Sequence, residues 1–285
     1  MQPQRYQDID WNLLWRQAQA EKSWQSKGAS DWDARAVSFA QRTEQSPYTH
    51  AFLHLLHPDP DWSVLDVGSG PGTLALPLAS RVKTVTCIDF SATMLKILAD
   101  RAAEEQLANI RICPISWTDD WKQHGVAPHD LVIASRSLAV PDLDAALRRL
   151  TDFALHKVAV TDRVGYGPFD PDAFAAVGRP LNPGPDYIYT VNILYRMGYL
   201  ASVDFIRLEE TARYPSFDQA ASRYLWMFRD LSATETKRLH RYLHSISVLH
   251  ADGTVSLHCR HVPTWAFISW HPDRSPQLPG SKQCG

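Results

Sequence analysis

The sequence has almost no net charge and no long run of apolar residues. Its 285 residues carry a formal net charge of −2, which excludes a general basic surface for nucleic acid and leaves room only for a local patch. No apolar stretch approaches the roughly 18–20 residues that span a membrane. The polar start, Met1 to Arg5, does not resemble a signal peptide. We therefore expect a cytoplasmic protein with neither a nucleic-acid nor a membrane partner.

Cysteine is scarce, and no metal-binding signature is present. The 4 cysteines show no close pairing along the chain, which favours a reduced protein. His240 and His244 are four residues apart on an expected helix, and His258, Cys259 and His261 lie close together further on. Their spacing matches no known zinc signature. The sequence therefore predicts no metal site.

One stretch, from Val64 to Thr73, dominates what is present. It predicts a short buried strand, a tight turn with Gly68, Gly70 and Gly72, and the start of a helix. A glycine backbone can bend through positive φ and lie flush against a ligand. The free N–H groups of a helix start favour a polar or anionic ligand. Because no Lys-Ser/Thr pair follows the glycines, a P-loop is excluded.

The glycine spacing discriminates between nucleotide-like ligands. A dinucleotide site requires G-x-G-x-x-G, but here Thr73 stands where the third glycine of that motif belongs. Asp66 precedes the first glycine by two residues, and a carboxylate there attracts a cation rather than a pyrophosphate. A nicotinamide or nucleotide-sugar enzyme on a related fold is therefore the less favoured alternative.

The D-x-G-x-G-x-G pattern formed by Asp66, Gly68, Ser69, Gly70 and Gly72 resembles the first motif of the class I S-adenosylmethionine-dependent methyltransferases. The resemblance implies that S-adenosyl-L-methionine is the cofactor. It also implies that the acidic residue helps to hold the methionyl ammonium and that the backbone of the glycine turn contacts the same region. All five residues are therefore candidate cofactor-binding residues.

The end of the next expected strand supports the same interpretation. Asp89 stands where a carboxylate can accept hydrogen bonds from both hydroxyls of a ribose; the alternative is that it only caps a helix. The run from Asp89 to Leu95 resembles the second methyltransferase motif. Phe90 can lie against the adenine face, and Met94 belongs to the same run. We expect Asp89, Phe90 and Met94 to bind the cofactor.

Two later strand ends contribute further candidates. Ser116, Trp117 and Asp119 fall where the family places its adenine-reading residues. The family more commonly has an Asp followed by a small residue there, so a solvated loop is the alternative. Ser135 ends the fourth expected strand, where the family usually places a backbone carbonyl near the methionyl amino group. Arg136 either meets a substrate carboxylate or pairs with a surface acid.

The order of elements predicts the fold class. From Asp61 onward, strand and helix patterns alternate, which is typical of an α/β, doubly wound sheet. We expect a mostly parallel, seven-stranded Rossmann-like sheet with added N-terminal and inserted helices. The division predicted is an N-terminal helical appendage at 1–57, a Rossmann-like domain at 58–272 with a helical insertion at about 209–255, and a disordered tail at 273–285.

The added segments are rich in aromatic residues. We hypothesise that residues 1–50 and 209–255 form a lid over an acceptor pocket; static packing against the core is the alternative. Within the first segment, Ser30 is expected to cap a helix, with Asp33 three residues on. The aromatic residues on which the lid hypothesis rests are Trp11, Trp15, Trp24, Tyr224, Trp226 and Phe228.

The function implied by the resemblance is methyl transfer from S-adenosylmethionine. No N-P-P-Y-type tetrapeptide, which many methylators of nucleic acid and protein amides carry, follows the fourth strand; residues 135–138 read Ser-Arg-Ser-Leu instead. This favours a small-molecule methyl acceptor. The alternative is a non-catalytic S-adenosylmethionine-binding sensor or scaffold. The sequence identifies neither a catalytic base nor the acceptor nor the oligomeric state.

Overall fold

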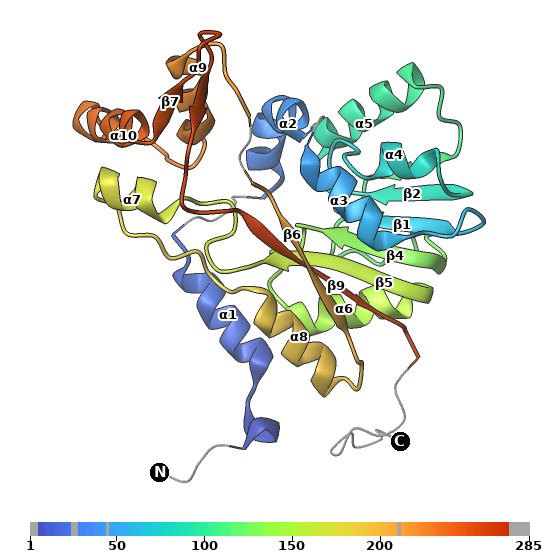
Figure 1. The fold of residues 1–285 in the computed structure, drawn as a ribbon. Helices are drawn as coiled ribbons and strands as arrows, with labels where there is room; N and C mark the ends of the chain where they lie inside the picture. Colours follow the sequence, from blue (N-terminus) through green and yellow to red (C-terminus); the bar gives the residue numbers. More distant parts are fainter. Residues whose placement is uncertain (1–4, 24–27, 44–45, 210–211, 274–285) are drawn as a thin grey trace.

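The computed structural model describes residues 5–23, 28–43, 46–209 and 212–273. Its main sheet has 7 strands in the order β3-β2-β1-β4-β5-β9-β6 (Figure 1). The predicted α/β fold with a seven-stranded sheet is therefore confirmed. The strands of this sheet are β1 (Ser63–Val67), β2 (Thr84–Ile88), β3 (Ile110–Cys113), β4 (His129–Ser135), β5 (Ala154–Arg163), β6 (Ser202–Arg207) and β9 (Thr264–Trp270).

The sheet is parallel except where β9 joins it. β1 lies between β2 and β4 and runs parallel to both. β9 runs antiparallel to β5 and β6, between which it is inserted. Because the strand order reverses direction between β1 and β4, the connections at their carboxyl ends diverge to opposite faces and leave a crevice there.

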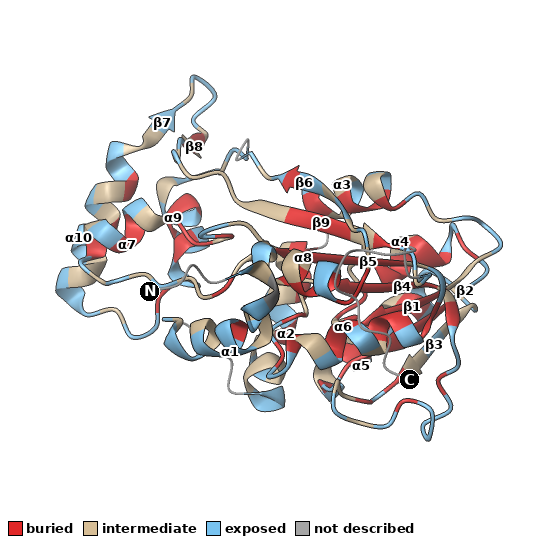
Figure 2. Cartoon of the chain, turned by 90° about the horizontal axis from the view of Figure 1, so that it is seen from below, coloured by how far each residue is buried: buried red, intermediate tan, exposed pale blue. Residues whose placement is uncertain are grey.

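Helices cover both faces of the sheet (Figure 1). One apolar cluster joins the sheet to α3 (Pro47–Leu56), α4 (Ala75–Ala79) and α5 (Ala92–Glu104). A second joins the opposite face to α1 (Trp11–Glu21), α6 (Leu143–Asp152) and α8 (Tyr187–Arg196). Figure 2 shows the resulting burial, which is greatest along the central strands. The sheet is therefore buried on both faces, as expected for parallel strands.

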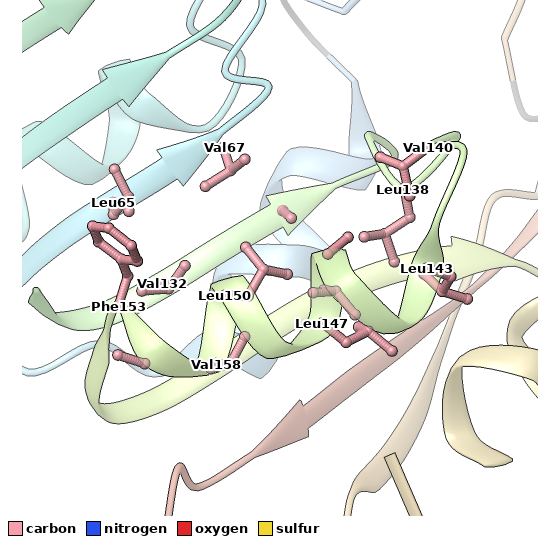
Figure 3. Packing of buried hydrophobic residues seen from close by; sticks show 14 of the residues in the cluster. Leu65, Val67, Val132, Leu138, Val140, Leu143, Leu147, Leu150, Phe153 and Val158 are labelled. Atoms are coloured by element: carbon pink, nitrogen blue, oxygen red, sulfur yellow. The ribbon is translucent and has the colours of Figure 1, made fainter. Parts of the chain in front are cut away.

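Helix α6 illustrates how local sequence produces this packing. Asp142 caps it by accepting a hydrogen bond from Ala145 N at 2.9 Å. Leu143, Leu147 and Leu150 follow at helical spacing, and each is 0% exposed. Figure 3 shows these leucines gathered against the sheet beside Leu65, Val132 and Val158. The cap sets where the helix begins, and the leucine stripe sets which face meets the sheet.

The inserted segment packs into a separate cluster away from the sheet. It contains α9 (Phe217–Leu225), α10 (Ala233–Ser245) and the hairpin of β7 (Ser247–Leu249) and β8 (Val255–Leu257). Its apolar core also includes α7 (Pro171–Val177), which comes from the loop after β5. Figure 1 shows α7, α9 and α10 grouped together at one end of the molecule. The cluster therefore combines the insertion with a short helix from the loop-like segment 165–186, in which the sequence pattern allows a helix at residues 171–177.

Helix α2 (Ala29–Thr43) corrects one expectation. Ser30 was expected as its N-cap, but the helix already begins at Ala29, so that assignment is wrong. Asp33 acts elsewhere: its Oδ1 accepts hydrogen bonds from Ser91 Oγ at 2.6 Å and from Thr93 N at 3.1 Å. It thereby satisfies free N–H and O–H groups at the start of α5 rather than those of its own helix. This contact fixes α2 beside the crevice.

The chain begins with a short 3₁₀ turn, η1 (Tyr6–Asp8), before α1. Within the described residues, no helix combines the length and the apolar character needed to cross a membrane. The tail expected at 273–285 lies, apart from its first residue, outside the described residues.

Candidate active site

A large cavity opens at the carboxyl ends of β1, β4 and β5. Its volume is about 1260 Å³, which exceeds the roughly 300–1,000 Å³ of typical small-ligand pockets. The turn after β1 and the ends of β2, β4 and β5 form its floor, and α2 and residues 168–183 and 223–229 contribute to its walls. There is room for two ligands in one enclosure.

The glycine turn divides its residues between the cavity and the core. Gly68, Ser69 and Gly70 line the cavity. Gly70 has a φ of +55°, and a Cβ added there would meet nothing within 4 Å. Gly72 has a φ of +84°, and an added Cβ would approach Leu98 Cδ1 to 2.4 Å. Gly72 therefore allows α5 to pack close behind the turn, whereas Gly70 leaves open space where a ligand can approach the backbone.

Asp89 connects the glycine turn to the start of α5. It is 8% exposed and lines the cavity. Its Oδ2 accepts a hydrogen bond from Gly70 N at 2.9 Å, and its Oδ1 accepts one from Ser91 N at 2.8 Å. Burial raises the pKa of this carboxyl. Because a carboxylate offers about four acceptor positions, this capping role leaves capacity for ligand hydroxyls.

Asp66 is the most buried acid of the cavity wall. It is 2% exposed, and burial, followed by the neighbouring charge of Asp89, raises the pKa of its carboxyl to about 7. A cation placed beside the two carboxylates would favour their ionised forms and offset this cost. This corner therefore suits a positively charged ligand group.

Phe90 and Met94 also line the cavity, next to Asp89. Phe90 is 39% exposed and Met94 is 3% exposed. Ser91 between them caps α5 by accepting a hydrogen bond from Met94 N at 3.2 Å. The cap holds the start of the helix so that an exposed ring and a buried thioether border the same space.

The predicted residues after β3 are brought to the cavity only in part. Trp117 lines it, but Ser116 does not. Ser116 N donates to Asp119 Oδ2 at 2.7 Å, and Ser116 Oγ lies 3.0 Å from Thr118 Oγ1. Ser116 and Asp119 thus stabilise their own loop.

Ser135 lines the cavity as part of a hydroxyl cluster. Tyr48 OH lies 2.5 Å from Ser135 Oγ and 2.6 Å from Thr161 Oγ1. The next residue, Arg136, has a φ of +56°, and its guanidinium lies 4.1 Å from the centre of the Tyr48 ring. No salt bridge joins Arg136 to an acid in the described part of the chain. The described residues therefore give no support to the alternative that it pairs with a surface acid.

Several lining residues were not predicted from the sequence. Asp162 is 8% exposed and accepts a hydrogen bond from Thr190 Oγ1 at 2.8 Å, and burial raises the pKa of its carboxyl to about 6. Its position at the end of β5 is the signal that would have found it, because ligands bind at the carboxyl ends of such strands. Phe39, Arg42 and Trp265 also line the cavity, and no local pattern marked them.

The aromatic residues of the expected lid do not all reach the cavity. Trp15, Trp226 and Phe228 line it, whereas Trp11 and Tyr224 do not. Trp24 lies outside the described residues. Both added segments therefore contribute aromatic side chains to the walls; whether they move remains a hypothesis.

The histidines of α10 serve in packing. His244 stacks on Phe217, with 3.6 Å between ring centres. In the part of the chain that the structure describes, no group of three or more His, Cys, Asp or Glu side chains is placed to hold a metal ion.

Comparisons with known proteins agree with this geometry. The family model described as a methyltransferase domain matches residues 64–154. An uncharacterized protein of Haemophilus influenzae is 32% identical over 246 residues, covering 85% of this chain and 89% of the relative. Nocamycin O-methyltransferase of Saccharothrix syringae is 34% identical over 125 residues, covering 42% of each protein.

Solved structures share the fold at low sequence identity. A putative methyltransferase from Bacillus halodurans superposes with a TM-score of 0.54 at 11% identity, covering 79% of this chain and 98% of that one. The YcgJ protein of Bacillus subtilis gives 0.51 at 15% identity, with 78% and 98% covered. The strand order, the glycine turn and the family model matched over residues 64–154 agree: this part of the chain is a class I S-adenosylmethionine-dependent methyltransferase domain, with S-adenosylmethionine as its methyl donor.

Proposed function

We propose that this enzyme methylates a small molecule that binds beside the cofactor in the same cavity. The observation that carries the proposal is the size of that cavity. Its volume of about 1260 Å³ leaves space beyond one ligand, and α2 and residues 168–183 and 223–229 contribute further walls. A relative named nocamycin O-methyltransferase supports an acceptor of this kind.

The cofactor roles of the lining residues are part of the proposal. Gly70 fits a ligand that lies against the backbone, since the space beside it is open. The paired carboxylates Asp66 and Asp89 fit the ammonium and the ribose hydroxyls, because the raised pKa of each carboxyl would be lowered by these partners. Phe90 and Met94 offer apolar surface for the adenine, and Ser135 lies toward the methionyl end. Gly68 and Ser69 complete the turn, while Gly72 supports it from behind.

The contribution of the chain to the reaction would be alignment and exclusion of water. The bound cofactor supplies an electrophilic methyl group. Holding the acceptor in line with it turns an encounter between two molecules into a step within one complex, which accounts for much of the acceleration in such transfers. The walls built by α2 and residues 223–229 remove bulk water from the reacting groups.

Labelled methyl transfer tests the acceptor class. Purified enzyme and cofactor with a radiolabelled methyl group are incubated with cell extract, which is then divided by ultrafiltration. We expect label in the fraction that passes the membrane, and at least about tenfold less label with Asp89→Ala at a cofactor concentration below the dissociation constant of the wild-type enzyme. Label found only in retained protein or nucleic acid would refute a small-molecule acceptor.

A further inference from the structure

Several arginines line the cavity. They come from α2, from the ends of β4 and β5 and from residues 179 and 223–229. The glycine side instead carries the carboxylates Asp66 and Asp89. The cavity therefore offers an anionic corner to one ligand and a cationic wall to whatever lies beside it.

Three of these arginines have carboxylate partners within the protein. Arg179 Nε lies 2.6 Å from Glu235 Oε1. Arg35 and Arg229 approach Asp31 to 3.3 and 3.5 Å. One pair joins the segment after α7 to α10, one lies within α2, and one joins α2 to the loop after α9, so a structural role accounts for them.

Arg136 differs because its neighbours are aromatic rings. Its guanidinium lies 4.1 Å from the ring centre of Tyr48, 5.8 Å from that of Trp265 and 5.9 Å from that of Phe39. Its backbone N donates to Thr161 Oγ1 at 3.1 Å, which holds the residue in its left-handed conformation at the strand end. Ring faces compensate only part of the cost of burying a guanidinium. A bound anion would compensate the remaining part of this free-energy cost.

Arg42 extends the same cationic surface from α2. Its guanidinium lies 5.3 Å from the Trp226 ring and 5.9 Å from the Phe39 ring, so Phe39 contacts both arginines. Burial lowers the pKa of Arg42, and the nearby charges of Arg223, Arg35 and Arg136 lower it further. Among the described residues no salt bridge pairs Arg42 itself with an acid.

We propose that Arg136 and Arg42 bind an anionic group, a carboxylate or phosphate, of the methyl acceptor, whose apolar body lies on Phe39, Trp226 and Trp265. The guanidinium fork matches both anions and binds them with two parallel hydrogen bonds. This inference rests on the proposed small-molecule acceptor, because it names the chemistry of that acceptor. Ser137, next to Arg136, lies against Gly68: an added Cβ on Gly68 would meet Ser137 Cβ at 2.6 Å. The anion would therefore be anchored next to the cofactor turn.

The cofactor has a carboxylate of its own at the methionyl end, and a test must separate the two anions. The probes are benzoate and benzamide, which share size and shape and differ in charge. Each is titrated by calorimetry into protein saturated with S-adenosylhomocysteine, at low ionic strength. We expect benzoate to bind more tightly than benzamide. Arg136→Gln and Arg42→Gln should each weaken benzoate binding by about ten- to a hundredfold, the usual effect of losing a charged hydrogen bond.

The controls are a distant arginine and the affinity for S-adenosylhomocysteine. Arg148→Gln removes a surface arginine paired with Asp144 and should change nothing. Arg136→Lys keeps the charge without the fork and should retain part of the affinity for benzoate. If the glutamine variants instead lose S-adenosylhomocysteine while benzoate binding is unchanged, the arginines hold the cofactor, and the inference is overturned. Equal binding of benzoate and benzamide, or no binding of benzoate, also overturns it.

Fractionating the acceptor pool separates failure of the inference from failure of the proposed function. The small molecules of a cell extract are passed over an anion exchanger before the labelled reaction. We expect acceptor activity in the retained fraction. Labelled product only from the unretained, uncharged fraction would refute the anionic acceptor and leave the small-molecule proposal standing. No labelled small molecule from either fraction would refute both.

Discussion

On the glycine side of the cavity, the ligand-facing groups come from one stretch of chain between Asp66 and Met94. On the arginine side, they come from Phe39 and Arg42 in α2, Arg136 after β4, Trp226 after α9 and Trp265 in β9. The first side is a strand–turn–helix unit followed by a second strand. The second exists only once segments from most of the chain have packed together.

The two sides also differ in what holds their charges. The carboxylate of Asp89 is fixed by backbone N–H groups of Gly70 and Ser91, which cannot be removed by mutation of a side chain. The guanidinium of Arg136 lies, in the described part of the chain, among the side-chain rings of Tyr48, Trp265 and Phe39. The difference indicates that the glycine side is defined by backbone geometry, whereas the arginine side can be altered by single substitutions in distant parts of the sequence.

The largest effect is expected where that backbone geometry is tightest. Gly72→Ala would place a Cβ 2.4 Å from Leu98 Cδ1 and 3.0 Å from Leu76 Cγ, at a φ of +84°. Overpacking and left-handed backbone together should lower the free energy of unfolding by roughly 2–5 kcal/mol. Chemical denaturation without ligand measures it.

Gly70→Ala is the matched control, since the added methyl meets nothing within 4 Å. Only the cost of a left-handed backbone conformation remains, and the free energy of unfolding should fall by about 1–2 kcal/mol. Its methyl group instead enters the cavity and should weaken binding of S-adenosylhomocysteine. Wild-type affinity in this variant would show that the cofactor does not lie against the turn.

The next effect concerns Asp89, whose carboxylate both accepts hydrogen bonds from the backbone at the start of α5 and is proposed to bind the cofactor. Asp89→Ala should reduce the binding free energy of S-adenosylhomocysteine by about 1.5–3 kcal/mol, as expected for lost hydrogen bonds to a charged group. Calorimetry measures this change. Ser91→Ala is the control, because it removes the α5 cap and should cost about 1 kcal/mol of stability. Equal affinity loss in both variants would mean that Asp89 acts only through the helix start.

The glycine side was predictable because each of its signals is local. Buried strand, three glycines and a following helix are read from ten consecutive residues, and parallel strands then fix where Asp89 must lie. Where a prediction near this side failed, the side chain bonds to another group of the protein instead of taking its predicted role. Ser116 and Asp119 bond to each other instead of facing the cavity. Asp33 bonds across to Ser91 rather than within α2, because a carboxylate satisfies whichever N–H and O–H groups packing brings near.

No comparable local pattern in the sequence predicts the arginine side. Phe39 and Trp265 are 226 positions apart in numbering yet both border the guanidinium of Arg136, and only the packing of α2 and β9 on the sheet brings them together. The insertion was predicted as helical, but Phe174 of α7 also packs into its apolar core. Contacts of this range follow from tertiary packing rather than from periodicity or capping signals.

A smaller effect follows from the titration of Asp66, whose raised pKa is about 7. If its carboxylate meets the cofactor ammonium, binding requires the ionised form. Affinity for S-adenosylhomocysteine should then fall by about tenfold per pH unit below pH 7, reaching about tenfold at pH 6. Asp66→Asn should abolish this dependence. A wild-type dissociation constant that is constant between pH 6 and 7 would place the ammonium elsewhere.

The raised pKa of Asp66 also predicts the sign of the pH dependence of stability. A pKa raised above the unfolded value of 3.8 means that the folded, ligand-free chain binds this proton more tightly. Asp66 should therefore lower the free energy of unfolding as pH rises from about 4 to about 7. Asp162, with a pKa of about 6, changes in the same direction, so the informative quantity is the difference between wild type and Asp66→Asn.

The smallest effect is expected in the walls of the arginine side, which form the hypothesised lid. Helix α2 meets the loop after α9 through Arg229 and Asp31 at 3.5 Å and through Arg42 over the Trp226 ring at 5.3 Å. Partly exposed ion pairs of this kind contribute little to stability, so the contact can open without unfolding the core. Walls that close over reactants are typically mobile without ligand.

Hydrogen exchange decides whether they close. Adding S-adenosylhomocysteine together with methylated product should slow exchange in peptides from 28–43 and 212–255, as well as in the glycine turn. Arg229→Ala should reduce the protection of the walls while leaving that of the turn unchanged, because it removes a contact on the arginine side only. Protection confined to 64–76 and 87–95 would mean that the added helices pack statically, and the two sides of the cavity would then differ in charge and in origin but not in mobility.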